Sequence, residues 1–190
     1  NLNHKQMIKT LKFFGVIFII VQTSVSCSND DETKIIYQDA FEHYIGELYD
    51  GGMIYHLYKG SDGVEHGLIV SLTESSAVWQ TTPTLTNANR SWDGEYNTSL
   101  MTGSPAVTYI STLGAGWYIP SIDEMEKLSS NRFEVNKALF EGGYLLISDT
   151  NAYWSSTEIN TNYASCFYFS TSGTPWSKIN PLTVRGVKTF

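Results

Sequence analysis

The sequence is poor in charged residues, and especially in basic ones. Charged residues make up 16% of the 190 residues, and 12 Lys and Arg stand against 19 Asp and Glu. The first 26 residues hold three of the lysines and no acidic residue, so the remainder has a formal charge of −10. Without a basic stripe, a protein cannot displace the counterions of a nucleic acid or be attracted to an anionic membrane surface. We therefore expect no nucleic-acid partner.

The sequence also has few residues in patterns that carry catalysis or hold metal ions. Its two cysteines, Cys27 and Cys166, allow at most one disulfide. Its four histidines are scattered, without the His-x-His or His-Glu-x-x-His spacing of metal sites. It has neither a phosphate-binding glycine-rich loop followed by lysine nor a Gly-x-Ser-x-Gly nucleophile motif. We therefore predict no metal and no cofactor, and we expect that the protein is not an enzyme.

The N-terminal part of the sequence is typical of an export signal. Lys9 and Lys12 flank the start of an apolar run over residues 11–21, and small residues follow this run. A run of this length is too short to span a bilayer as a stable helix, which favours a cleaved signal. We therefore predict a signal peptide over residues 1–26, with Met7 as the natural start of translation.

A short motif at the end of this segment indicates how the protein is held at a membrane. The letters S-V-S-C at residues 24–27 resemble a bacterial lipobox, which implies that Cys27 is the first mature residue and carries lipid. The alternative is ordinary cleavage that leaves Cys27 free. The acidic residues at 30–32 resemble the surface-export signal of Bacteroidota-type lipoproteins. This resemblance implies a lipid anchor in the outer membrane, with residues 27–45 as a tether and the protein facing the cell exterior.

The first strongly patterned region of the folded part predicts a hairpin. Apolar runs at 53–58 and 67–72 flank a loop rich in turn-forming residues. Residues 79–98 follow, rich in Thr, Asn and Ser and without a clear period. We expect a long loop here, packed by Trp79 and Trp92.

Helical patterns follow this loop. Apolar residues recur on one helical face over residues 105–113. Ser121 and Glu124 have the spacing of a capping box, which predicts the start of another helix. Its buried face would consist of Ile122, Met125 and Leu128. A further helix is predicted at about 132–140, and the chain ends in strand-like segments. The order of strands, helices and strands predicts one α+β domain over residues 46–190.

The middle of the C-terminal part, residues 159–183, is polar but almost uncharged. It has no acidic residue, Lys178 is its one base, and aromatic residues recur through it. Rigid aromatics beside Ser and Asn are typical of ligand-binding surfaces, because they combine contact area at low entropic cost with adaptable hydrogen bonds. The alternative is a plain β-meander whose aromatic residues face the core. The predicted ligand-binding residues are Ile159, Asn160, Asn162, Tyr163, Ser165, Cys166, Tyr168, Ser170, Ser172, Thr174, Pro175, Trp176, Ser177, Ile179, Asn180 and Leu182.

Four segments together resemble a bacterial domain family. They are G-G-M-I-Y-H-L at 51–57, G-W-Y-I-P-S-I-D-E-M at 116–125, A-Y-W-S-S-T-E at 152–158 and V-R-G-V-K at 184–188. The chain is similar to the Lcl C-terminal-like domain, formerly a domain of unknown function, which is related to the fold shared by C-type lectins and formylglycine-generating enzymes. The resemblance implies a C-type lectin-like α+β domain with an irregular, β-rich C-terminal half that displays a binding face. It does not imply formylglycine generation, which needs a pair of reactive cysteines.

A narrower resemblance concerns lipoproteins of this fold that are targets of diversity-generating retroelements. In those proteins a variable stretch lies between a W-S-S-T-like segment and a terminal V-R-x-V-like strand, which here are residues 154–157 and 184–187. This resemblance implies that residues 159–183 are hypervariable, with Trp176 and Lys178 as fixed positions.

These observations lead to one main hypothesis and two alternatives. The main hypothesis is a surface-anchored receptor or adhesin that binds a protein or carbohydrate at a cell or phage surface, with Trp176 as its anchor and Tyr163 able to stack on a sugar ring. A structural subunit of a fimbria or surface layer would instead need a free strand edge. An enzyme of the formylglycine-generating superfamily with altered chemistry would need a pocket in which ionisable side chains converge. The candidates for that pocket are Asp123, Glu126, His56 and Arg185.

Overall fold

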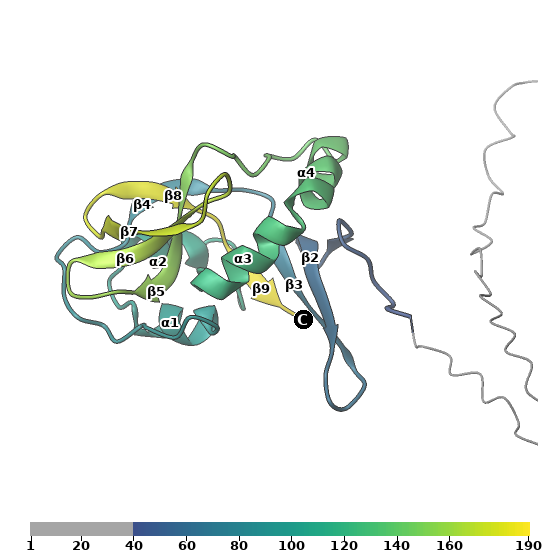
Figure 1. The fold of residues 1–190 in the computed structure, drawn as a ribbon, viewed down its shortest axis with the longest axis horizontal. Coiled ribbons are helices and arrows are strands. Elements are labelled where there is room, and N and C mark those ends of the chain that lie inside the picture. The colour runs from purple at the N-terminus through teal and green to yellow at the C-terminus, as the bar shows by residue number, and fades with distance from the viewer. Residues whose placement is uncertain (1–39) are drawn as a thin grey trace, which may run out of the picture. The chain divides into compact units, whose positions relative to one another are not determined.

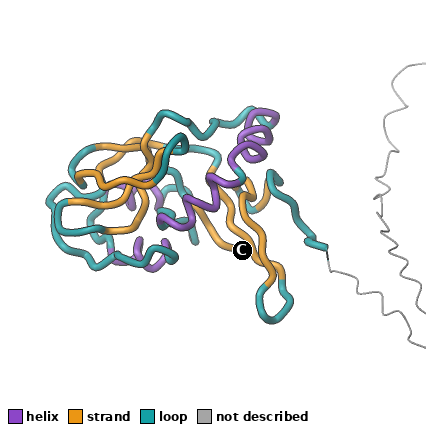
Figure 2. Tube along the Cα trace, viewed as in Figure 1, coloured by secondary structure: helices purple, strands orange, loops and turns teal. Residues whose placement is uncertain are grey.

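The computed structural model describes residues 40–190, drawn in colour in Figures 1 and 2. The predicted signal peptide, Cys27 and most of the predicted tether lie outside these residues. In chain order the elements are β1 (Leu48–Tyr49), β2 (Gly52–Lys59), β3 (Glu65–Ser71), β4 (Ser75–Val78), α1 (Gly94–Leu100), α2 (Pro105–Ser111), α3 (Ile122–Ser130), α4 (Arg132–Glu141), β5 (Ala152–Glu158), β6 (Tyr163–Tyr168), β7 (Gly173–Ser177), β8 (Pro181–Val184) and β9 (Val187–Thr189). Within the described part, no helix has the length and apolar character needed to cross a membrane.

The strands form two sheets, and the last strand returns to the first sheet. One sheet has the order β1-β2-β3-β9 and the other the order β4-β8-β5-β6-β7. Strand β9 pairs antiparallel with β3, so the C-terminus lies beside the β2–β3 hairpin (Figure 1). Helix α3 crosses between the two sheets in the same view. The predicted α+β class is therefore confirmed.

The predicted hairpin is present as β2 and β3. Its loop turns at Gly63, which has a φ of 77°. The pairing contains an irregularity between Ile54 and His56, which changes the alternation of the side chains along β2. Ile54 and Ile69 are fully buried at the base of the hairpin. The distal half extends beyond the sheet (Figure 2).

Helix α3 begins as the sequence predicts. The Ser121 side chain accepts a hydrogen bond from the Glu124 backbone N–H, and the Glu124 carboxylate accepts one from the Ser121 N–H at 2.7 Å. Met125 and Leu128 are buried as expected, whereas Ile122 is only half-buried. The predicted helices near residues 105–113 and 132–140 are confirmed as α2 and α4.

Residues 79–98 are not one long loop, and their two tryptophans differ. The last five residues belong to α1, where Asp93 is the N-cap and its carboxylate accepts a hydrogen bond from the Tyr96 N–H at 3.0 Å. The short helix has no strong apolar period, so only this cap residue signals it in the sequence. Trp79 is fully buried, as expected. Trp92 is 69% exposed, so the prediction that it packs the loop is wrong.

Two apolar clusters form the core. The first packs α3 and α4 against the four-stranded sheet, with Met53, Val70 and Leu139 among its members. The second packs α2 against the five-stranded sheet around Trp79 and Trp154. The indole N–H groups of these tryptophans donate to the Ser155 and Ala77 carbonyls, each at 3.0 Å. Each buried tryptophan contributes on the order of 4–6 kcal/mol of hydrophobic free energy before entropic costs.

Candidate functional site

The predicted ligand-binding stretch forms β6, β7 and β8 with their connecting turns. Strands β6 and β7 pair in the register Tyr163↔Ser177, Ala164↔Trp176, Ser165↔Pro175 and Cys166↔Thr174. Ten of the predicted residues are exposed: Ile159, Asn160, Asn162, Tyr163, Ser170, Ser172, Pro175, Trp176, Ile179 and Asn180. Five are half-buried: Ser165, Tyr168, Thr174, Ser177 and Leu182. Only Cys166 is buried.

Cys166 does not belong to the binding surface. Its side chain is fully buried in the second core cluster, and its strand position lies opposite Trp154. Burial raises the pKa of the thiol to about 11, so it is neither exposed nor reactive at neutral pH. The hypothesis of a lone thiol on the ligand face is therefore wrong, because β6 turns this side chain toward the core.

Trp176, the proposed anchor, and Tyr163, proposed to stack on a sugar ring, lie on opposite faces of the sheet. Residues that pair across antiparallel strands share a face, and successive residues alternate. Trp176 therefore shares a face with Ala164, whereas Tyr163 shares the other face with Ser177. Tyr163 is 45% exposed and Trp176 is 37% exposed. A single flat ligand cannot stack on both rings unless it reaches around β7.

The β-meander alternative describes part of the same stretch. Phe167 and Phe169 are buried in the first core cluster, where their rings meet edge-to-face with centroids 5.2 Å apart. Both faces of β6 are therefore covered near its end: Cys166 meets the second cluster and Phe167 the first. The exposed part is the other end of the strand, at Tyr163 and Ser165. We call Tyr163, Ser165, Pro175 and Ser177 the tyrosine face.

The turn that leads into β6 is fixed by its own hydrogen bonds. The side-chain oxygen of Asn160 accepts from the backbone N–H groups of Asn162 at 2.9 Å and Tyr163 at 3.0 Å. The Ile159 N–H donates to the Tyr163 carbonyl at 3.0 Å. These bonds hold the turn in one conformation. The protein chain would therefore lose little conformational entropy when a ligand binds here.

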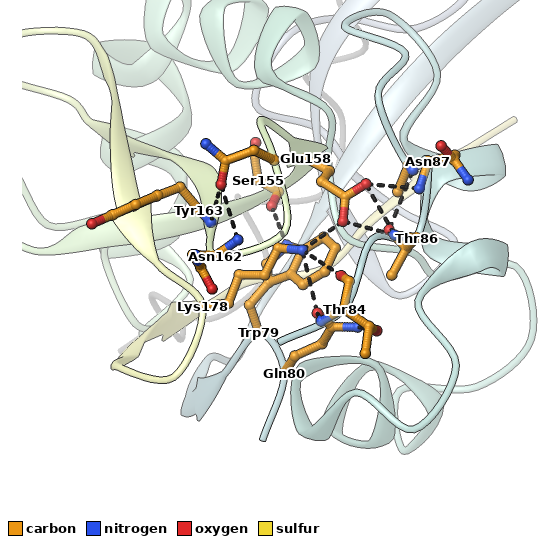
Figure 3. Close-up of polar contacts among 12 residues, drawn as sticks. Trp79, Gln80, Thr84, Thr86, Asn87, Ser155, Glu158, Asn162, Tyr163 and Lys178 are labelled. Atoms are coloured by element: carbon orange, nitrogen blue, oxygen red, sulfur yellow. Dashed lines mark hydrogen bonds and ion pairs between the residues drawn. The ribbon is translucent and has the colours of Figure 1, made fainter. Parts of the chain in front are cut away.

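A buried ion pair lies beneath this turn. Lys178 is fully buried, and its Nζ donates to Glu158 Oε1 at 2.5 Å, the Thr84 carbonyl at 2.9 Å and Gln80 Oε1 at 3.3 Å. Figure 3 shows these bonds around the Lys178 ammonium, with the Trp79 ring beside it and the Tyr163 side chain directed away. The three N–H groups of the ammonium are therefore all satisfied.

The Glu158 carboxylate is satisfied in the same way. It accepts from the backbone N–H groups of Thr86 at 2.9 Å and Asn87 at 2.7 Å, as well as from Lys178. Burial alone would raise the pKa of Glu158. The hydrogen bonds from Lys178 and Thr86, with the lysine charge, outweigh burial and lower the pKa below its ordinary value of 4.5. The Glu158 carboxylate therefore remains charged at neutral pH.

The ion pair connects three segments that are far apart in the sequence. The Lys178 carbonyl accepts from the Trp79 and Gln80 N–H groups, and the Lys178 N–H donates to the Asn162 carbonyl at 3.0 Å. The turn before β8 is thereby joined to the 79–87 segment and to the turn before β6. Sequence reasoning missed this role. The signal was present, since Lys178 is the one charged residue of an otherwise uncharged stretch.

The residues named for an enzymatic site do not converge. Arg185 is buried and bonded internally: its Nε donates to the Ser71 carbonyl at 2.8 Å, and its guanidinium pairs with Glu74. Asp123 accepts from the Ser91 hydroxyl at 2.8 Å. The two remaining candidates, His56 and Glu126, line separate hollows. Within residues 40–190 no group of three or more His, Cys, Asp or Glu side chains is placed to hold a metal ion.

Comparisons with known proteins identify a structural neighbour. A fimbrial protein from Bacteroides ovatus ATCC 8483 matches with a TM-score of 0.57 and 20% sequence identity. The match covers 68% of this chain and 37% of that chain, so the present chain corresponds to well under half of the neighbour. At this identity the likeness concerns the fold alone. Searches against protein-family models and curated proteins gave no match.

Proposed function

We propose that this protein is a fimbria-associated module of a bacterial cell surface that binds a ligand through its C-terminal sheet. The fold that it shares with a fimbrial protein supports the surface association. One observation carries the binding role: a largely exposed, uncharged set of aromatic and polar residues stands on β6 and β7, beside a turn that a buried ion pair holds in place. Such a surface is rigid before the ligand arrives, which lowers the entropic cost of binding.

The tyrosine face is the centre of the proposed contact. Tyr163 provides an apolar ring with a hydroxyl, and Ser165 and Ser177 provide hydrogen-bonding groups beside it. Pro175 adds rigid apolar surface between the two serines. The ligand class is a protein or a carbohydrate on a cell or phage surface, recognised by stacking and hydrogen bonds. A ligand that also contacts Trp176 must extend around the edge strand β7.

Binding to arrayed glycans and surface proteins tests this proposal. The purified protein is applied to the array together with Tyr163→Ala, Trp176→Ala and the control Tyr144→Ala, which lies outside the sheet. We expect Tyr163→Ala to weaken binding by about tenfold or more. Trp176→Ala weakens it as well only if the ligand spans both faces. Equal binding by all three variants would refute a binding site on this sheet.

A structural fimbrial subunit is the second candidate, because the solved neighbour is a fimbrial protein. Assembly by strand addition needs free backbone groups at a sheet edge. After β7, the Lys178 backbone N–H donates inward to the Asn162 carbonyl. The backbone groups at positions 173, 175 and 177 of β7 therefore point outward, away from β6, and position 175 is Pro175. Proline lacks an N–H, which blunts this edge. Light scattering of the wild type and of Pro175→Thr, which restores the donor, tests this: chains formed by the wild type would favour the structural role, whereas chains formed by the variant alone would show that Pro175 prevents assembly and would favour the binding role.

Pairing of the last strand β9 with β3 closes the domain on itself, which supports the proposed C-type lectin-like arrangement.

We also propose that Cys27 carries a lipid anchor in the outer membrane, which mass spectrometry of the membrane-extracted protein tests directly.

We propose further that residues 159–183 vary between cells of one strain. The buried positions of the stretch, such as Phe167 and Lys178, would then stay constant while exposed ones such as Tyr163 change. Sequencing this locus and its flanks across many cells tests the idea. A uniform sequence without a neighbouring template copy would reject it.

A further inference from the structure

A cavity lies away from the C-terminal stretch, at the hollow that His56 lines. Its volume is about 270 Å³, and it is bounded by the β2–β3 hairpin with β9, the start of α1, and α3. None of its lining residues belongs to the 159–183 stretch. They are His56, Tyr58, Leu68, Trp92, Asp93, Glu95, Tyr118, Glu124, Lys127 and Thr189.

One side of the cavity carries the exposed indole of Trp92. Although the side chain is 69% exposed, the backbone beside it is fixed. The Ser91 hydroxyl donates to the Asp123 carboxylate at 2.8 Å, and the Asp123 N–H donates to the Ser91 carbonyl at 2.9 Å. The large apolar ring is therefore presented to solvent on a rigid support, which favours contact with an external molecule.

The hairpin carries a second exposed aromatic ring on the cavity wall. Tyr58 is 45% exposed. Its ring stacks between His56 and His66, with centroid distances of 5.8 and 5.4 Å and interplanar angles of 27° and 28°. This row fixes the orientation of the Tyr58 ring, so the cavity has two aromatic residues from different elements at its rim.

The floor of the cavity is polar and already organised. The Glu124 carboxylate accepts hydrogen bonds from the Tyr118 hydroxyl at 2.9 Å and from the Ser121 N–H at 2.7 Å. Burial, and then the charge of Lys127, lower the pKa of His56, so its ring is neutral at neutral pH and offers one donor and one acceptor.

Two charged side chains remain available for a ligand. Among the described residues, neither Glu95 nor Lys127 has a side-chain hydrogen-bond partner, and both are exposed at the cavity. By contrast, Asp93 already pairs with Arg90 at 2.8 Å and caps α1. The cavity thus offers one strong acceptor and one strong donor. An anionic ligand would meet repulsion from the carboxylates of Asp93, Glu95 and Glu124, and a cationic ligand would meet repulsion from Lys127.

We propose that this cavity binds one ring of a neutral carbohydrate. A pyranose ring has an apolar face, which suits the rings of Trp92 and Tyr58, and hydroxyl groups that both donate and accept hydrogen bonds. Glu95 accepts from one hydroxyl, and Lys127 donates to another. Since the volume is slightly below the roughly 300 Å³ at which sites for drug-sized ligands begin, a single ring fits better than a chain of sugars.

Fluorine NMR of the intact protein with 5-fluorotryptophan tests this site. The chain has five tryptophans, and Trp92→Ala identifies the Trp92 signal by its loss. The probes are methyl glycosides of neutral hexoses and N-acetylhexosamines, and lysine methyl ester is the cationic comparison. We expect a saturable shift of the Trp92 signal with at least one sugar. Affinity is then measured by calorimetry, and Glu95→Gln and Trp92→Ala should each weaken it by about tenfold or more.

The controls separate this site from the C-terminal sheet. Glu141→Gln lies outside both the cavity and the C-terminal sheet and should leave sugar affinity unchanged, and the Trp92 signal reports binding at the cavity and not at the sheet. If no neutral sugar shifts the Trp92 signal, or if Trp92→Ala binds sugar as tightly as the wild type, the proposal is refuted. A shift with lysine methyl ester alone also refutes it and identifies a cation site instead.

Discussion

At the scale of single residues, Lys178 and Glu158 show how a nearly uncharged stretch can still depend on charge. Removing two charges from water is costly, and the pair is stable only because every donor of the lysine and both carboxylate oxygens have partners. Loss of either partner leaves a buried, uncompensated charge. The net contribution of the intact pair to the free energy of unfolding is therefore small, whereas the loss of one partner lowers that free energy by much more.

We predict that Lys178→Met destabilises the protein by about 3–5 kcal/mol, because Glu158 is then left charged and unpaired in the interior. Urea unfolding measures the change. The matched control is Lys137→Met, which removes an exposed pair with Glu141 and should cost no more than about 1 kcal/mol. Adding Glu158→Leu to Lys178→Met should restore part of the lost stability. Equal effects of the two single variants would show that the buried pair has no special role.

We further predict that acid destabilises the protein through Glu158. Its pKa is lowered in the folded state, so its contribution is complete above the ordinary value of 4.5 and is lost as the pH falls through the folded value. Glu124 has a raised pKa because of burial, so its contribution has the opposite sign and is lost as the pH rises. Unfolding free energies between about pH 3 and pH 7 should fall less steeply toward acid in Glu158→Gln than in the wild type. A parallel slope in both proteins would contradict this assignment.

At the scale of elements, the structure separates what sequence patterns determine locally from what tertiary contacts decide. The start of α3 follows from Ser121 and Glu124 alone, because a capping box satisfies backbone donors within one turn. The hairpin loop is local in the same sense. The positions of Trp92 and Cys166 are not local. One depends on the contact of Ser91 with α3, and the other on which face of β6 meets the core.

The candidate site was predictable to a similar extent. Composition singled out the stretch, and most of its chosen residues are exposed; their role in binding stays a prediction. Composition could not give the register of β6 and β7, which places Tyr163 and Trp176 on opposite faces. Nor could it locate the cavity beside Trp92, because the hairpin, α1 and α3 that bound it are separated in the chain.

The capping box of α3 gives a prediction at this scale. Ser121→Ala removes the acceptor for the Glu124 N–H in a fully buried position, so we expect a loss of about 1 kcal/mol in unfolding free energy. Ser130→Ala, at the exposed end of the same helix, should change stability by less than about 0.5 kcal/mol. Thermal and urea unfolding of both variants decide the matter: a Ser121→Ala protein as stable as Ser130→Ala would mean that the box contributes nothing.

At the scale of the whole molecule, the chain closes when its last residue returns to the N-terminal hairpin. The Phe190 N–H and carbonyl exchange hydrogen bonds with Gly67, each at 3.1 Å. The Phe190 ring also lies 4.8 Å from the Tyr49 ring and 5.6 Å from the His43 ring. Glycine is favoured at position 67, since a Cβ there would come within 2.8 Å of the His56 backbone carbonyl and within 2.3 Å of the Phe190 ring. One aromatic residue therefore joins β1, β3 and the segment before β1.

We predict that Phe190→Ala destabilises the protein by about 1–3 kcal/mol and releases these segments together, because the lost ring packs against all of them. Hydrogen exchange should accelerate at residues 43–49 and at Gly67, while the amides of β5 and β6 in the other sheet keep their protection. Phe133→Ala is the control, since its ring is 77% exposed and its removal should leave both exchange and stability unchanged. Faster exchange throughout both sheets would instead mean that the two sheets unfold as one unit and that the C-terminal residue stabilises the proposed binding face as well.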